Sequence, residues 1–152
     1  MASLPPKEDV LDACRGLASG DHFVLSCAGR LAELHEQRLC VESGGTAIID
    51  RDRARLVHDI DRWVATELPQ AHDSARMHTE TVGTVIDRLS QFSALAYLTL
   101  TAAPQRVLED ACRRLGELAM GYDDLASEVT AGKCDGDLFR LFVEGEVYRA
   151  VL

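Results

Sequence analysis

Residues 107–129 read VLEDACRRLGELAMGYDDLASEV, and this stretch decides the fold class. Its apolar residues recur at intervals of three and four, which is the spacing of one face of an α-helix. They are Val107, Leu108, Ala111, Leu115, Leu118, Tyr122, Leu125 and Val129. On the outer face, Glu109, Arg113 and Glu117 are spaced for pairing across one helical turn. We therefore expect a long amphipathic helix over about 104–130.

The same periodicity recurs upstream of this stretch. It predicts helices over about 7–18, 21–38, 50–68 and 79–101, with Asp21 as an N-cap and Pro69 as a terminator. Alanine, leucine and valine dominate the apolar residues and only 5% of residues are aromatic, a balance that favours helix over sheet. The sequence thus predicts an all-α bundle of about five to six helices with no β-sheet.

The chain has the length of one domain, and we expect a single helical-bundle domain over residues 1–152. The glycine-containing segment 41–49 is expected to be a flexible loop rather than a domain boundary, because neither flank is long enough to fold alone. Residues 137–152 form an apolar tail with too many apolar sides for a free surface helix. We expect this tail to dock on the bundle or to take part in oligomerisation.

Charge and cysteine content narrow the range of partners. A net charge of −9 argues against nucleic acid and against an anionic membrane surface, both of which need an excess of lysine and arginine. The five cysteines are odd in number and contain no C-x-x-C pair, so we expect reduced thiols. No stretch approaches the length of a membrane span, and no signal peptide is recognisable. These features predict a cytoplasmic protein.

Four polar side chains are the strongest candidates for a site. His35 lies on the apolar face of the second expected helix, and His78 precedes the fourth. Glu80 and Asp87 are seven residues apart, which places them on one face if both are helical. Two imidazoles and two carboxylates are a reasonable ligand set for a divalent metal that activates water or holds a phosphate.

A structural role for the same residues is the competing interpretation. Core histidines are normally hydrogen-bonded, a glutamate favours the positive end of a helix dipole, and Asp87 can pair with an arginine of a neighbouring helix. The spacing matches neither the Glu-x-x-His pattern of di-iron bundles nor the His-Glu-x-x-His pattern of metalloproteases. No cofactor-binding motif and no nucleophile in a signature context is present, so the catalytic residues stay unknown.

The run from His78 to Leu89, HTETVGTVIDRL, resembles the hallmark segment of an uncharacterised bacterial α-helical family, domain of unknown function 4254. Leu34-His35 and Ile60-Asp61 are similar to its upstream elements, and the resemblance covers about residues 25–130. It implies a helical bundle and a bacterial intracellular protein, and it brings no established activity. It also marks Thr79 and Arg88, with His78, Glu80 and Asp87, as site residues.

Two functions follow as expectations. The first is a non-catalytic module that self-associates, most simply as a dimer, or binds a protein partner. It is motivated by the tail and by the second half of the fourth helix, which is apolar on both faces. The alternative is a metal-dependent phosphohydrolase or nucleotide pyrophosphatase that uses His35, His78, Glu80 and Asp87. Whether the protein is an enzyme stays open at this point.

Overall fold

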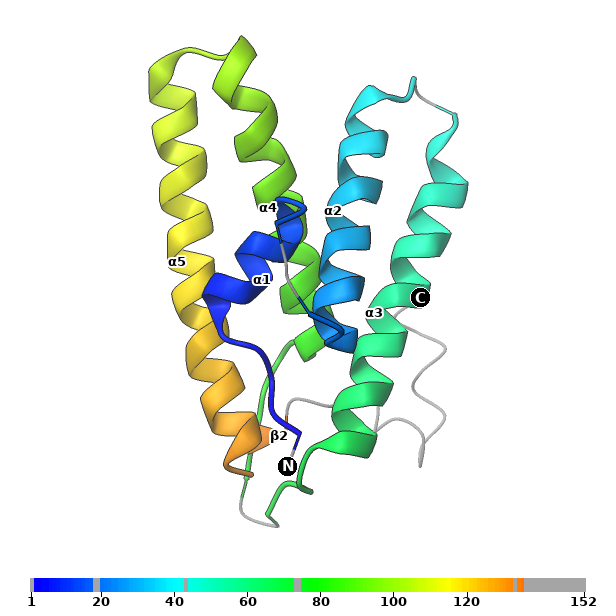
Figure 1. Ribbon diagram of the computed structural model, residues 1–152, viewed down its shortest axis with the longest axis vertical. Coiled ribbons are helices and arrows are strands. Elements are labelled where there is room, and N and C mark those ends of the chain that lie inside the picture. The colour runs from blue at the N-terminus through cyan, green and yellow to red at the C-terminus, as the bar shows by residue number, and fades with distance from the viewer. Residues whose placement is uncertain (1, 18–19, 43, 73–74, 133, 136–152) are drawn as a thin grey trace.

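The computed structural model describes residues 2–17, 20–42, 44–72, 75–132 and 134–135 (Figure 1). Within these ranges the chain forms five helices, which confirms the predicted all-α bundle. They are α1 (Lys7–Cys14), α2 (Phe23–Cys40), α3 (Thr46–Glu67), α4 (Val82–Ala102) and α5 (Gln105–Thr130). None of the described helices is both long and apolar enough to cross a bilayer. The tail, residues 137–152, lies outside the described residues.

Helix α4 is the centre of the bundle. It packs against each of the other four helices, and Figure 1 shows α5 on one side of it and the α2–α3 hairpin on the other. Its mean hydropathy is the highest of the five helices, and apolar residues such as Val82, Ile86 and Leu89 are fully buried. A helix with apolar residues on several sides needs such enclosure. Buried apolar residues from all five helices contribute to one core.

The N-terminal segment is fastened to α5, far along the chain. The buried hydroxyl of Tyr122 donates a hydrogen bond of 2.7 Å to the carbonyl oxygen of Pro5. Asp123 accepts two more, from the backbone nitrogen of Lys7 at 2.9 Å and from its Nζ at 2.7 Å. Burial raises the pKa of the Tyr122 hydroxyl, so this donor stays protonated. Helix α1 is thereby held across α5.

Several helix boundaries differ from those expected. His22 rather than Asp21 caps α2, because its Nδ1 accepts the backbone N–H of Val24 at 3.2 Å. Helix α3 begins at Thr46, so the last four residues of the predicted loop 41–49 are helical. Burial of Ile49 explains this earlier start, since the added turn contributes an apolar side chain to the protein interior.

The start of α4 also lies later than expected. Its first helical residue is Val82 rather than Thr79, because Thr81 is the N-cap and its Oγ accepts the backbone N–H of Thr84 at 3.1 Å. Just before this cap, β1 (Arg76–Met77) pairs in parallel with β2 (Cys134–Asp135). Each strand has two residues, so this pairing ties the α3–α4 connection to the end of α5 without changing the all-α class.

Helices α3 and α4 approach one another closely at Gly83. Its backbone N–H donates a hydrogen bond of 2.7 Å to Oδ1 of Asp61, a buried carboxylate on α3. A Cβ on Gly83 would lie 2.5 Å from the carbonyl oxygen of Val57 and 2.7 Å from Asp61 Oδ1. Both distances are too short for a real Cβ contact, so the neighbouring atoms would have to move. The Val57 oxygen belongs to the backbone. Only glycine fits this contact without separating the helices.

We predict that Gly83→Ala lowers the free energy of unfolding by about 1–3 kcal/mol, because the added methyl group forces α3 and α4 apart. Urea denaturation followed by circular dichroism measures this change. Gly116→Ala is the matched control, since Gly116 is an exposed helical glycine whose added methyl group would have no described atom within 4 Å beyond its own helix backbone. The control should gain about 0.5–1 kcal/mol from helix propensity. Equal stability of the Gly83→Ala variant and the wild type would contradict this explanation of the contact.

Candidate functional site

His35 and Asp87, two of the predicted site residues, contact one another across the α2–α4 interface. The Nε2 atom of His35 lies 2.8 Å from Oδ1 of Asp87. The His35 side chain is 3% exposed and that of Asp87 is 16% exposed. His35 continues the core-facing stripe of α2, four residues after Leu31. Asp87 lies on the same side of α4 as the buried Gly83 and Ser90, four residues after the first and three before the second. The contact is therefore an interior polar pair between two helices.

Arg53 of α3 completes this pair, and sequence reasoning missed it. Its Nε and its second guanidinium nitrogen donate to the two carboxylate oxygens of Asp87 at 3.3 and 2.8 Å, a two-pronged geometry that suits arginine. A signal for it was present: Arg53 lies three and seven residues before the apolar Leu56 and Ile60, on the inner side of α3. An arginine on that side needs an acidic partner in the bundle.

The network extends from Arg53 to the surface through two more residues that the sequence did not indicate. Arg53 also donates to Oδ1 of Asp50 at 2.9 Å, and Asp50 accepts from Nε of Arg38 at 2.8 Å. We name the connected set, His35, Arg38, Asp50, Arg53 and Asp87, the three-helix network. It links α2, α3 and α4 through alternating charges.

The surroundings of Asp87 keep it ionised. Burial alone would raise the pKa of its carboxyl group, but the hydrogen bonds from His35 and Arg53 outweigh burial and lower the pKa below its ordinary value. Burial likewise opposes the charge on Arg53, yet hydrogen bonds to Asp87 and Asp50 raise its pKa. The arginine and the aspartate thus stabilise one another as an ion pair.

The other predicted site residues form a second group before the N-terminus of α4. His78 Nδ1 lies 3.1 Å from the carbonyl oxygen and 3.3 Å from the backbone nitrogen of Glu80. The Glu80 carboxylate forms a two-pronged ion pair with Arg88, in the second turn of α4. Thr79 is exposed. Glu80 precedes the helix, so it does not share the helical period that was expected to align it with Asp87.

Asp61 belongs to the same end of α4, and it was not among the predicted site residues. Its carboxylate accepts the N–H of Gly83 in the first turn of α4, while Thr81 caps the N–H of Thr84. A carboxylate at this position satisfies a backbone donor that has no helical partner and interacts favourably with the helix dipole. The sequence signal was limited to the resemblance, in which Ile60-Asp61 is an upstream element.

These positions divide the four candidate metal ligands between two places. His35 contacts Asp87, His78 contacts Glu80, and the parts of the chain that the structure describes contain no group of three histidine, cysteine, aspartate or glutamate side chains that could hold a metal ion. Each carboxylate is also paired with an arginine, whose charge opposes the approach of a divalent cation. The four residues thus form two separate pairs instead of the expected single cluster, and in the second pair His78 contacts the Glu80 backbone rather than its carboxylate.

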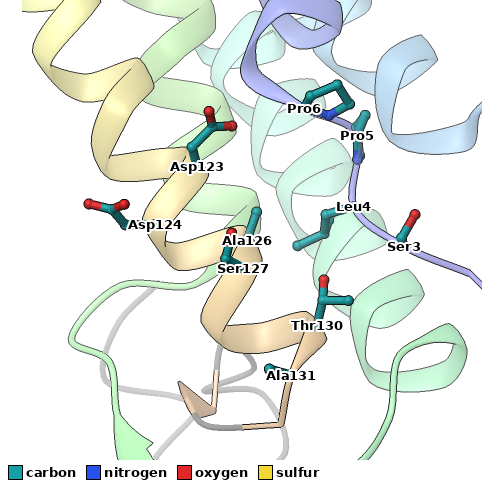
Figure 2. Close-up of a pocket in the computed structure, with 10 residues that line it drawn as sticks. All are labelled: Ser3, Leu4, Pro5, Pro6, Asp123, Asp124, Ala126, Ser127, Thr130 and Ala131. Atoms are coloured by element: carbon teal, nitrogen blue, oxygen red, sulfur yellow. The ribbon is translucent and has the colours of Figure 1, made fainter.

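A cavity of about 620 Å³ lies elsewhere, between the N-terminal segment and the last turns of α5 (Figure 2). Figure 2 shows Asp123 and Asp124 at one end of it and Thr130 and Ala131 at the other, with Leu4 beside them. The predicted site residues lie away from this lining. Asp123 is engaged by Lys7, so the lining combines apolar residues with the hydroxyl groups of Ser3, Ser127 and Thr130 and the carboxylate of Asp124.

Comparison with known proteins gives a family but no activity. A family model described as "Protein of unknown function (DUF4254)" matches residues 47–135. The chain belongs to this family. The DUF4254 match runs from α3 to β2 and includes Arg53, Asp61, Glu80 and Asp87. It begins after α2, so His35 lies outside it, although the resemblance was expected to start near residue 25. No curated protein and no solved structure matches the chain.

We predict that Asp87→Asn destabilises the protein by about 2–3 kcal/mol at neutral pH, because Arg53 keeps its charge inside the bundle without its main partner. The folded-state pKa of Asp87 is lowered, so its stabilising contribution is complete above its unfolded pKa, about 3.9, and is lost as the pH falls through the folded value. The stability difference between variant and wild type should therefore shrink below about pH 4. Urea denaturation over a pH series measures it.

Asp9→Asn is the matched control for this measurement, because Asp9 is an exposed aspartate of α1 and does not belong to the three-helix network. It should unfold like the wild type at each pH. A difference between Asp87→Asn and the wild type that is independent of pH would refute the assignment of the ion pair.

We also predict that Mn²⁺ or Zn²⁺ leaves the melting temperature unchanged in protein purified without chelator, since the candidate ligands form two separate pairs. Differential scanning fluorimetry measures this directly. A metal-induced rise that both Asp87→Asn and Glu80→Gln abolish would show that the two pairs hold one ion, and the assignment of two independent pairs would then fall.

Proposed function

We propose that this DUF4254 protein is a non-catalytic helical bundle that self-associates with a second copy of the chain. The contact surface is the open end of the bundle, which we define by four exposed apolar residues: Leu39, Tyr97, Leu100 and Val107. One observation carries the proposal. Each of these residues lies on the core-facing stripe of its helix, but near the end of that helix, where the stripe is exposed.

Helix α4 demonstrates this continuation. Ile86, Leu89 and Ser93 lie on its buried face, and steps of three and four residues lead from them to Tyr97 and Leu100. Yet Tyr97 is 64% exposed and Leu100 is 59% exposed. Large apolar side chains on a core-facing stripe are normally covered, so their exposure here indicates a surface with a partner.

The neighbouring helices α2 and α5 end in the same way. Leu39 follows the buried Leu31 and His35 on α2 and is 53% exposed, and Val107 precedes the buried Ala111 on α5 and is 47% exposed. Figure 1 shows the α2–α3 hairpin and the α4–α5 hairpin diverging towards this end. Three stripes that contribute to one core elsewhere thus end in exposed apolar residues at the open end.

Charge favours a second copy as the occupant. Residues 89–105 include no aspartate, glutamate, lysine or arginine, although the chain carries a net charge of −9. Two such acidic copies repel one another over most approaches, and an uncharged apolar surface is where they can meet at the lowest electrostatic cost. Covering a fully exposed large apolar side chain gains about 1.5–3 kcal/mol, so burial of these residues would favour association.

The paired carboxylates support the non-catalytic part of the proposal. Asp87 and Glu80 are each neutralised by an arginine, and His35 is buried. A general base or a metal ligand has to reach a substrate or an ion. Stabilisation of helix contacts needs neither, and it explains every hydrogen bond of the three-helix network.

We predict that Leu100→Glu converts a dimer into a monomer, because a glutamate on the open end leaves a charge in the contact. Sedimentation velocity and light scattering over a concentration series measure the change. Leu17→Glu is the matched control: Leu17 is 69% exposed, follows α1 and lies outside the open end, so the same substitution there should leave the dimer intact.

Three outcomes would contradict self-association through the open end. One is a wild-type protein that stays monomeric at high concentration. Another is a monomer that dimerises only after residues 137–152 are removed, which would show that the tail of the same chain covers the open end. Equal dissociation of the Leu17→Glu and Leu100→Glu variants would place the contact elsewhere.

A further inference from the structure

The cavity between the N-terminal segment and the last turns of α5 has a mixed apolar and polar lining (Figure 2). Its buried apolar residues are Leu4, Pro5 and Ala126, and the exposed Pro6 and Ala131 add apolar surface at its edge. We name this cavity the α5 groove. Its volume of about 620 Å³ is enough for several large side chains.

The polar residues of the α5 groove include groups that have no described partner. The hydroxyl groups of Ser127 and Thr130 form no hydrogen bond with any residue that the structure describes. Asp124 is exposed and forms no ion pair within the described part of the chain, whereas Asp123 is paired with Lys7 at 2.7 Å. Figure 2 shows Asp124 at the outer edge of the lining. A segment in the groove therefore binds best with a cation at this edge.

The sequence that follows the described residues contains a segment that matches this lining. Residues 138–142 read LFRLF, so that Arg140 lies between two pairs of large apolar residues. Two of the four phenylalanines of the chain are in this segment. Contiguous apolar side chains of this size favour a surface that removes them from water, and the single charge among them is opposite to that of Asp124.

We propose that residues 138–142 bind in the α5 groove of the same chain, with Arg140 paired with Asp124. The apolar side chains of the segment contact the apolar lining, and the unpartnered hydroxyl groups of the groove form hydrogen bonds with its backbone. The α5 groove is separate from the open end. The inference thus goes beyond self-association and does not depend on it.

The chain can reach the α5 groove from its last described residue. Asp135 of β2 follows four residues after Ala131, which lines the groove. β2 runs parallel to β1, which leads into α4, and α4 is antiparallel to α5 (Figure 1). The chain therefore points back along α5 when it leaves β2. The residues from Asp135 to Arg140 span up to about 17 Å, whereas Asp124 lies about 10 Å along α5 from Ala131.

This short connection favours the same chain over a second copy as the occupant. A segment on a short tether has an effective concentration of about millimolar. A second copy also has to overcome the repulsion between two chains that each carry a net charge of −9. A ligand that carries phosphate is disfavoured as well, because Asp124 would repel it.

Limited digestion with chymotrypsin tests the contact, because cleavage depends on release of the segment from the groove. In the Leu100→Glu variant, which removes the open-end contact, cleavage after Phe142 should be about tenfold slower than after Tyr148, outside the segment. Asp124→Arg should speed cleavage after Phe142 about fivefold, since it places two cations together. Adding Arg140→Asp to the same chain should restore slow cleavage, because the opposite charges are exchanged. Mass spectrometry of the initial products measures each rate.

A second variant tests the apolar part of the contact. Ser127 is exposed and lines the groove, so Ser127→Trp fills the groove without disturbing the core and should make cleavage after Phe142 as fast as after Tyr148. Met120→Trp is the matched control, since Met120 is 65% exposed on α5 and outside the lining. Glu42→Arg is the control for charge reversal, because Glu42 is exposed beyond α2. Both controls should digest like their parent.

Four outcomes would overturn the proposal. Equal cleavage after Phe142 and Tyr148 in the parent would show that the segment is not bound. Slow cleavage that survives Ser127→Trp would place the segment elsewhere, and failure of the double exchange would remove the ion pair. Slow cleavage that appears only at high protein concentration would assign the groove to a second copy. Dimerisation at the open end is measured by sedimentation of the wild type, so the two proposals can fail separately.

Discussion

The carboxylate of Asp87 has to be compensated inside the bundle, and this requirement relates three helices to one another. A buried charge is tolerated only with partners that supply hydrogen bonds, and these partners come from α2 and α3. Apolar packing alone would allow the helices to slide with small changes in buried area. The directed hydrogen bonds to His35 and Arg53 fix their relative positions. Gly83 adds a second constraint, since its contact with Asp61 sets the separation of α3 and α4.

Sequence periodicity was sufficient to predict the helices, but it was not sufficient to predict the polar contacts between them. The stripe on α5 and the glycine and proline positions indicated about five to six helices, and the described residues form five, because burial of an amphipathic face depends on local spacing. The partner of Asp87 depends on which neighbouring helix presents a cation, which is a property of tertiary packing. Arg53 could have been suspected from its position on the inner side of α3. The link to Arg38 and Asp50 could not.

The expected alignment of Glu80 with Asp87 failed for a local reason. It required α4 to include Glu80, so that both carboxylates would share a face. Thr81 caps the helix instead, so Glu80 precedes it. The Glu80 carboxylate accepts a hydrogen bond from Arg88. The same periodicity also cannot distinguish a stripe that is covered by the chain itself from one that is left open. Tyr97 and Leu100 have the spacing of core residues, yet both are exposed.

The hydrogen bonds between the N-terminal segment and α5 constrain the order in which parts of the chain can fold. Tyr122 and Asp123 lie 117 and 116 residues along the chain from the groups they bind, Pro5 and Lys7. Contacts of such long sequence separation form late, because the entropy of closing a large loop is lost before they are gained. During synthesis, the N-terminal segment therefore lacks its hydrogen-bond partners on α5 until that helix has been made, although α1 can already pack against α2. The α2–α3 and α4–α5 hairpins have local contacts and can form first. They then provide the surface to which the N-terminal segment binds.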